Sequence, residues 1–224
     1  AAHQRRGGAA EKQPVPRGRQ GKPTGCAGLT LPPVIVRASG RGGRFTGSGG
    51  TTHKLQALLA GKPVLQYTQD AVLASGLPWH LEDAGHPGMG DSIAAAVSAT
   101  WPSSGWLVLP GDLPLIRSNT LRSIAAALQA HDVVVPLYRG QRGHPVGFHA
   151  HCGQALLNLK GARGAAALVL AYSALEFAVQ DIGCVTDTAT VHDLRAAQLR
   201  IHLLRQQAAT RVCRIGVGHR RPAA

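Results

Sequence analysis

The sequence predicts one α/β domain with a Rossmann-like, mostly parallel sheet and helices on both faces. Short apolar runs alternate with longer helical stretches over residues 31–200, the pattern of parallel strands joined by crossover helices. Three of these runs, Val34–Val36, Trp106–Leu109 and Val133–Val135, are wholly apolar, as expected of buried strands. A glycine-rich stretch follows the first run, where the carboxyl end of a parallel strand opens onto a ligand.

The first half of the domain provides clear signals for its other elements. The stretch from Ser39 to Gly50 is too rich in glycine for a helix or a strand. Pro63 suits the first position of a helix that runs to Ser75, and Gly76 suits the C-terminal cap of that helix. A short strand is expected over residues 79–82.

Two polar residues are expected to cap later helices. Asp91 suits the N-cap of a helix that precedes the second buried strand, and Ser118 suits the N-cap of the helix after it. Residues 154–174 should hold one or two helices and residues 175–181 a strand. A closing helix is expected over residues 189–204.

The formal net charge of +13 lies in the two ends of the chain. Residues 1–30 hold six Lys or Arg and one acidic residue, and residues 195–224 hold seven Arg and no acidic residue. We expect residues 1–30 to be a disordered basic tail, residues 31–200 the folded domain, and residues 201–224 a basic extension. The nearly neutral middle and the low aromatic content of 4% disfavour a nucleic-acid-binding module.

Composition also bears on location and on metals. No apolar stretch approaches the ~18 residues that cross a bilayer, and no secretory h-region is visible, so a cytoplasmic protein is expected. The four cysteines lie far apart and are expected to be reduced thiols. His149 and His151 would share a face of a strand, but the sequence shows no third ligand, so no transition-metal site is expected there.

The first segment with chemical content is VIVRASGRGGRF at residues 34–45, followed by Lys54. Glycines allow backbone N–H groups to approach a triphosphate, and Arg44 and Lys54 carry the positive charge that its oxygens require. Taken alone, such a segment is also compatible with an ordinary solvated loop.

The second segment is Gly111-Asp112-Leu113-Pro114, directly after a buried strand. A carboxylate at that strand end can bind Mg²⁺, a hard cation that prefers one or two carboxylates together with phosphate oxygens. The alternative is a simple turn, because Gly, Asp and Pro are common turn residues.

The third segment is RGQRGHPVGF at residues 139–148, and here too a hairpin turn with a basic tip is the alternative. Together with GMGDSI at residues 88–93 and the stretch 184–194, these segments resemble the MobA-like nucleotidyltransferase family. The resemblance covers residues 33–198 in the family's order. The family's patterns are L-A-A-G-x-S/G-x-R-M/F-G with a later Lys, G-M-S-S-S-L, G-D-M-P and D-x-D-T-P-x-D-L, and R-G-H-P-V-x-F belongs to its molybdenum cofactor cytidylyltransferase branch.

This resemblance implies a fold of the nucleotide-diphospho-sugar transferase type and transfer of CMP from Mg²⁺-CTP to a phosphorylated acceptor. The implied acceptor is molybdopterin in its molybdenum-loaded form, with release of pyrophosphate and handover of the product to a molybdoenzyme or its chaperone. The implied catalytic residues are Asp112, Arg44 and Lys54; Asp112 and Asp187 would bind Mg²⁺, and His144 and Asp187 the acceptor. The implied nucleotide-binding residues are Ala38, Ser39, Gly40, Gly42, Gly43, Arg44, Lys54 and Ser92.

The chain also departs from the family pattern. Arg37 replaces a leucine at the end of the first strand, and Ser39 stands where cytidine enzymes have alanine and guanine enzymes have glycine, so both bases stay open. Residues 45–54 form a longer stretch than usual, and residues 76–88 are too few for the usual strand-helix-strand. Ala189 and Val191 replace the second Asp and the Pro of the late motif. A guanylyl- or sugar-phosphate nucleotidyltransferase and a catalytically silent nucleotide-binding relative remain alternatives.

Overall fold

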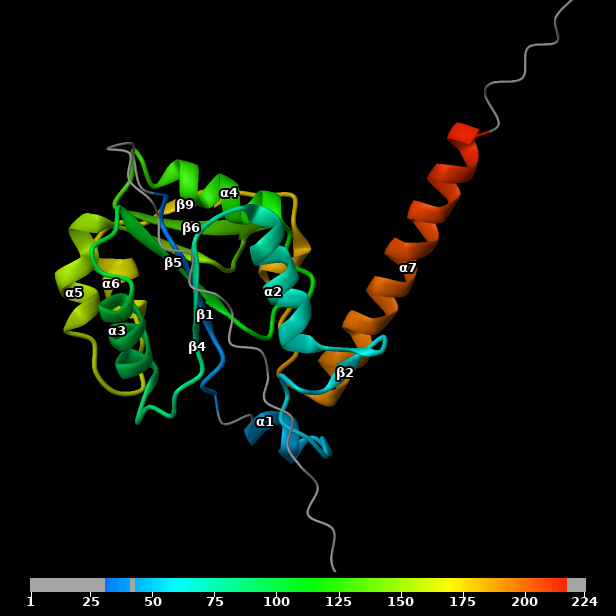
Figure 1. Cartoon of the computed structure of the whole chain (residues 1–224), viewed down its shortest axis with the longest axis horizontal. Helices are drawn as coiled ribbons and strands as arrows, with labels where there is room; N and C mark the ends of the chain where they lie inside the picture. Colours follow the sequence, from blue (N-terminus) through cyan, green and yellow to red (C-terminus); the bar gives the residue numbers. More distant parts are fainter. Residues whose placement is uncertain (1–30, 41–42, 217–224) are drawn as a thin grey trace, which may run out of the picture.

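A computed structural model describes residues 31–40 and 43–216, with side chains up to residue 206 (Figure 1). Its main sheet has the strand order β4-β1-β5-β8-β6-β7, and β9 also pairs with β6. The strands are β1 (Val34–Arg37), β4 (Trp79–Glu82), β5 (Gly105–Pro110), β6 (Val133–Tyr138), β7 (Gln141–Arg142), β8 (Val146–His149) and β9 (Leu175–Ala178). Strand β1 is parallel to β4 and β5, and β9 is parallel to β6, whereas β8 is antiparallel to β5 and β6. The predicted mostly parallel sheet is confirmed.

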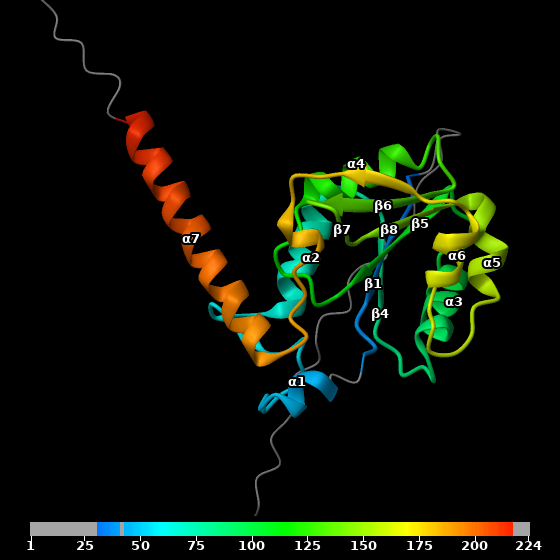
Figure 2. The same cartoon turned by 180° about the vertical axis from the view of Figure 1, so that it is seen from behind.

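Helices cover both faces of this sheet (Figures 1 and 2). Helices α2 (Val64–Ser75) and α4 (Ser118–Ala127) lie on one face, and α3 (Met89–Ala99), α5 (Gly153–Leu157) and α6 (Ala166–Ala171) lie on the other. Strand β1 serves both layers, because Val34 and Val36 join the core under α2 and α4 while Ile35 joins the core under α3. A strand that is buried on both faces carries a continuous apolar run, which here is Val34–Val36.

The glycine-rich stretch and the start of α3 differ from the sequence prediction. Residues 39–50 contain a short helix, α1 (Gly43–Gly47), where no helix was expected. Helix α3 begins at Met89 with Gly88 as its N-cap, so Asp91 lies in the first turn, and its Oδ2 accepts a hydrogen bond from Gly161 N at 2.9 Å. Gly88 packs closely against the backbone of Gly161, and this contact fixes an earlier helix start.

Most other boundaries follow the prediction to within a residue or two, but β6 ends three residues later than predicted and β9 three residues earlier. Pro63 is the N-cap of α2 and belongs to a small hairpin of β2 (Leu58–Leu59) and β3 (Lys62–Pro63), and Gly76 is the left-handed C-cap. Ser118 is the first residue of α4, whose N-cap is Arg117. The stretch 154–174 holds two helices, and residues 175–178 form the expected strand.

The closing helix α7 (Val191–Gly216) is longer than predicted and runs across the expected domain boundary at residue 200. Its first half packs on the domain through Ala197 and Ile201, which contact a buried cluster with Leu55, Leu59 and Val64. The rest projects away from the sheet in both views (Figures 1 and 2). No helix among the described residues is long and apolar enough to cross a membrane.

Two of the four cysteines have described side chains, and both are free and buried. Burial, assisted by the negative charge of Asp132, raises the pKa of Cys152 to about 11. Burial and Asp181 raise the pKa of Cys184 to about 11 as well. Both therefore remain protonated thiols at neutral pH, in agreement with the prediction, whereas the side chains of Cys26 and Cys213 lie outside the described part.

Asp181 joins the start of α4 to the segment that leads to Asp187. Its buried carboxylate accepts hydrogen bonds from Thr120 Oγ1 at 2.6 Å, from Arg117 N at 2.9 Å and from Gly183 N at 2.9 Å. Gly183 packs so tightly on the backbone of Leu115 that an added Cβ would lie 2.0 Å from the Leu115 carbonyl oxygen. The residues after this turn are thus fixed relative to α4.

We expect Asp181→Ala to lower the free energy of unfolding by about 2–3 kcal/mol, because it leaves partly or fully buried donors without their charged acceptor. Urea denaturation measures this change. Asp83→Ala, at an exposed carboxylate, is the matched control and should stay within about 0.5 kcal/mol of wild type. Equal losses in the two variants would contradict the anchoring role of Asp181.

Candidate functional site

Three parallel strands end together at one edge of the sheet. The register pairs Arg37 at the end of β1 with Glu82 at the end of β4 and with Pro110 at the end of β5. Gly111 N donates to Arg37 O at 2.9 Å, so the loop that carries Asp112 begins directly beside β1. In open parallel sheets this edge is where ligands bind.

Asp112 and Lys54 form an ion pair at this edge. Lys54 Nζ lies 2.5 Å from Asp112 Oδ2, and the two side chains are only 17% and 8% exposed. The Lys54 stem also passes over Gly40, where an added Cβ would lie 3.9 Å from its Cε. The predicted phosphate-binding cation and the predicted metal-binding carboxylate are therefore adjacent, and they neutralise each other in this structure.

Asp187 lies next to this pair. Thr188 N and Thr188 Oγ1 donate to Asp112 O at 3.0 and 3.3 Å, which places the preceding residue beside Asp112. Burial and the negative charges of Asp112 and Asp193 raise the pKa of Asp187, while Arg44 and Lys54 act in the opposite direction. The structure thus brings all four predicted charged residues into one electrostatic environment.

The donor set at this edge fits a hard divalent cation. Asp112 and Asp187 offer carboxylate oxygens, and the negative charge of Asp112 contributes to the raised pKa of Asp187, an effect that a bound cation would relieve. Arg44 and Lys54 supply the opposite charge for phosphate oxygens. Lys54 and Asp112 already pair with each other. When a metal ion and a phosphate bind, Asp112 would exchange Lys54 for the metal cation, and Lys54 would exchange Asp112 for the phosphate anion.

The nucleotide-binding residues predicted after β1 lie together, apart from Gly42, which is outside the described residues. Ser39 Oγ lies 3.0 Å from Ser92 Oγ, so the loop after β1 meets the first turn of α3. Ala38 N donates to Glu82 O at 2.8 Å and extends the pairing of β1 with β4. Gly43 and Arg44 open the short helix α1, with Arg44 exposed.

Arg37, which departs from the family pattern, pairs across strands with Glu82. Glu82 is only 5% exposed, and its carboxylate also accepts from Ala84 N at 3.2 Å and bonds His86 Nε2 at 2.9 Å. Burial lowers the pKa of Arg37, and the charges of Asp112 and Glu82 counteract that effect. A cation at residue 37 is thus accommodated by a buried carboxylate on the neighbouring strand.

His144 lies close enough to Asp112 and Arg37 for their charges to act on its imidazole. His144 N donates to Cys184 O at 2.8 Å, and Gly143 approaches the same carbonyl so closely that a Cβ would lie 2.4 Å from it. Burial lowers the pKa of His144; the charge of Asp112 and a backbone hydrogen bond at Val108 oppose this shift, and the charge of Arg37 adds to it. In the described part of the chain, its Nδ1 and Arg37 Nε are the two buried side-chain nitrogens without a hydrogen-bond partner.

The tip of the segment 139–148 forms a hairpin turn, which was the alternative interpretation of this segment. Arg139 and Gly140 both have positive φ, at 50° and 84°, and they form the tight turn between β6 and β7. Arg142 Nε lies 2.6 Å from Glu176 Oε1 on β9, so this arginine is directed along the sheet. Only the part from Gly143 onward reaches the site.

Sequence reasoning missed three residues of this edge: Glu82, His86 and His53. His53 Nε2 lies 2.6 Å from Gly40 O and so contacts the predicted phosphate loop. Glu82 could have been found, because it ends a predicted strand just as Arg37 does. His53 and His86 lie in irregular segments, where sequence periodicity predicts no contacts.

The fold and this edge define an α/β protein of the nucleotidyltransferase type. Residues 67–176 match the family model described as MobA-like NTP transferase domain, and none of the curated proteins matches. Over these residues the chain is similar to the MobA-like NTP transferase family. The matched residues include Ser92, Asp112 and His144, whereas the loop after β1, Lys54 and Asp187 lie outside them.

Solved structures share the fold at low sequence identity. Rv0371c from Mycobacterium tuberculosis is 23% identical with a TM-score of 0.65, covering 76% of this chain and 98% of its own, and it has also been solved as a complex with manganese. Molybdopterin-guanine dinucleotide biosynthesis protein A from Archaeoglobus fulgidus is 16% identical, with a TM-score of 0.57. The match covers 75% of this chain and 98% of that protein. 4-Diphosphocytidyl-2C-methyl-D-erythritol synthase from Anaerococcus prevotii is 13% identical, with a TM-score of 0.58. The match covers 77% of this chain and 99% of that protein.

We expect Arg44→Ala and Lys54→Ala each to weaken Mg²⁺-CTP binding about ten- to a hundredfold, which corresponds to loss of one charge-assisted contact of roughly 1.5–3 kcal/mol. Calorimetric titration measures the affinity. Lys62→Ala is the matched control, because Lys62 pairs with Asp70 on an exposed surface.

The two variants should differ in thermal stability. Arg44 is exposed, so its removal should leave the melting temperature unchanged, whereas Lys54→Ala leaves the buried Asp112 without its partner and should lower it. Titrations are therefore made well below both melting transitions. Unchanged affinity in both variants would remove the triphosphate from this loop.

Proposed function

We propose that the protein is a Mg²⁺-dependent nucleotidyltransferase that moves CMP from CTP to a phosphorylated acceptor, with molybdopterin of the molybdenum cofactor as the favoured acceptor. The observation that carries this proposal is the gathering of Asp112, Asp187, Arg44 and Lys54 at the edge where β1 and β5 end. Two carboxylates and two cations at such an edge match the charges of a magnesium-bound triphosphate.

The reaction needs no enzyme nucleophile. An oxygen of the acceptor phosphate forms a bond to the α-phosphorus of CTP in line with the leaving group, and the bond from that phosphorus to the β-phosphate bridging oxygen breaks, which releases pyrophosphate. Mg²⁺ held by Asp112 and Asp187 would neutralise charge on the phosphate oxygens. Arg44 and Lys54 bind the leaving pyrophosphate, and the loop after β1 orients the nucleotide, so positioning and charge neutralisation provide the catalysis.

The acceptor side is assigned to Gly143 and His144, at the start of the segment 142–148. Its likeness to the R-G-H-P-V-x-F stretch favours the molybdenum cofactor, and its first residues are held against Cys184, in the turn that leads to Asp187. A product of this kind would be passed to a molybdoenzyme or its chaperone. The manganese complex of Rv0371c supports use of a divalent cation in this fold.

For the nucleotide base, guanine is a specific alternative to cytosine. Ser39 matches neither the alanine of cytidine enzymes nor the glycine of guanine enzymes, and the Archaeoglobus neighbour is named for a guanine dinucleotide. A guanylyltransferase is therefore the second candidate. Pyrophosphate release from CTP, GTP and ATP with Mg²⁺, with and without molybdenum cofactor, tests both, and release that requires the cofactor and CTP supports the proposal.

In that assay we expect Asp112→Asn to reduce turnover by at least about a hundredfold, because an amide lacks the charge that binds Mg²⁺. The amide oxygen can still accept from Lys54 Nζ, so the melting temperature should change little. Asp83→Asn, at an exposed carboxylate, is the matched control. Normal turnover by Asp112→Asn would refute the metal assignment.

His144 is expected to act on the acceptor and not on the nucleotide. His144→Ala should raise the KM for the acceptor at least about tenfold while the KM for CTP stays within about twofold, which is the signature of a lost acceptor contact. His192→Ala, at an exposed imidazole on α7, serves as control. A parallel rise of both KM values would indicate a general distortion of the site.

A further inference from the structure

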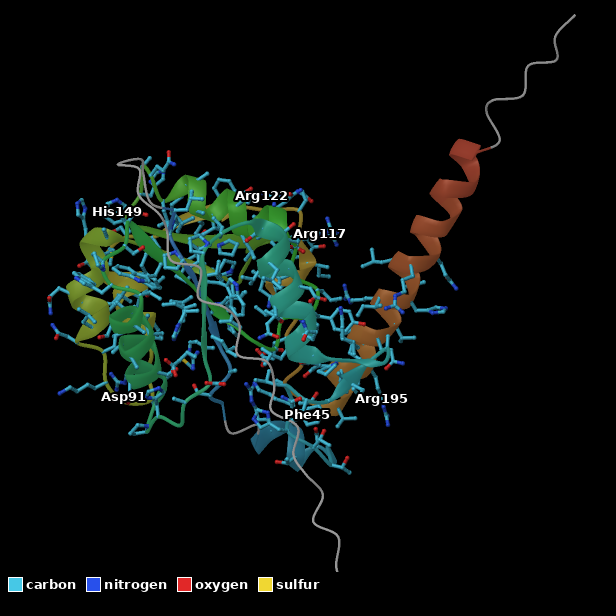
Figure 3. All side chains as sticks on the ribbon, viewed as in Figure 1. Phe45, Asp91, Arg117, Arg122, His149 and Arg195 are labelled. Carbon is cyan, nitrogen blue, oxygen red and sulfur yellow. The ribbon has the colours of Figure 1, made fainter. Side chains whose placement is uncertain are left out.

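A second group of metal-binding side chains lies at the other end of the sheet. Strand β8 is antiparallel to β5, and its last residue, His149, pairs with Gly105 at the start of β5, whereas Asp112 follows the end of β5. Figure 3 shows His149 at the opposite end of the domain from Phe45, which belongs to α1. Asp132 and His151 accompany His149 there.

The backbone holds these three residues together. His149 N donates to Asp132 O at 2.8 Å, so the end of β8 is tied to the residue that precedes β6. A 3₁₀ helix, η1 (Ala150–Cys152), follows at once and turns His151 back toward His149, with the two ring centroids 4.5 Å apart at an angle of 72°. His151 Nδ1 lies 3.2 Å from Asp132 Oδ1. One ligand atom from each of the three residues lies within 4.8 Å of the other two.

His149 has a local structural role, because its Nδ1 accepts a hydrogen bond from His151 N at 3.4 Å and caps η1. Stability accounts for little of the pairing between His151 and Asp132. The side chains of His151 and Asp132 are 75% and 49% exposed, and an ion pair so exposed contributes little to the free energy of folding. The proposed nucleotidyl transfer does not use these residues either, because they lie at the far end of β5. The cluster therefore calls for an explanation by a ligand.

We propose that Asp132, His149 and His151 bind a divalent transition-metal ion of the Zn²⁺ class. Two imidazoles and one carboxylate are a ligand set of zinc and related ions, whereas Mg²⁺ prefers oxygen ligands. Donor atoms around a tetrahedral zinc ion lie about 3.3 Å apart, given zinc-nitrogen distances of about 2.0 Å, so small side-chain rotations would close this triad on an ion.

The surroundings leave room for further ligands of the metal. A depression of about 480 Å³ beside the triad is lined by Asp132 and also by Tyr172 and Glu176. Three protein ligands and an accessible side are the arrangement of sites that retain water or bind an exogenous group in the remaining position. The site is thus distinct from the Asp112 edge in place and in preferred ion.

Titration of ZnCl₂ into the full chain, free of any histidine tag and in excess Mg²⁺, tests the proposal. Wild type should bind one zinc ion at this site, and His149→Ala and His151→Ala should each weaken its affinity more than about tenfold, since even loss of an outer partner of a metal ligand costs about 10–100-fold. His131→Ala is the matched control, because this exposed histidine adjoins Asp132 but is not part of the triad, and its affinity should stay within about twofold of wild type.

Further variants separate the outcomes. Asp112→Asn should keep the zinc affinity, and Asp132→Asn should weaken it and change the visible absorption of the Co²⁺-substituted protein. If an alanine variant melts below wild type, the glutamine variant at the same position replaces it in the titration. Equal zinc affinity in wild type and all triad variants, or a loss confined to Asp112→Asn or His131→Ala, would overturn the proposal.

Discussion

The parallel pairing of β1 with both β4 and β5 is the constraint on which the rest of the structure depends. It aligns Arg37, Glu82 and Pro110 in one register, so three chain segments that are distant in sequence end at a single edge. The loops that continue from those ends bring Ser39 to Ser92 and Asp112 to Lys54. Because β1 is buried on both faces, two separate hydrophobic layers hold it in place. The side chains at its carboxyl end are therefore attached to a well-packed strand.

Charge is balanced within this edge in an unusual way. Arg37 takes the place of an apolar residue, and a partly buried arginine would be costly without nearby negative charge. The carboxylate of Asp112 and, to a lesser extent, that of Glu82, opposite Arg37 in the register, supply this charge. Although the stretch at residues 76–88 is shorter than the family pattern, it still provides β4 and therefore Glu82.

The two ends of β5 differ in the ligands they offer. At its carboxyl end the acidic groups are oxygen donors next to cations, which suits a hard ion bound together with a polyphosphate. At its amino end imidazoles dominate, which suits a borderline ion with no need of a charged substrate. The antiparallel strand β8 is responsible for the second arrangement, because it returns the chain to the start of β5 and ends there in His149.

The sequence alone determined the parallel sheet, its buried strands and the place of Asp112 directly after a strand, because apolar periodicity and glycine or proline placement are local signals. It did not determine where α3 begins, since a contact between Gly88 and the distant residue Gly161 decides that. Nor did it show the Lys54–Asp112 pair or the cross-strand partner of Arg37, which depend on strand order and register. His149 and His151 were visible as a pair, but their third neighbour became apparent only in the fold, because Asp132 is brought to them by the antiparallel pairing of β6 with β8.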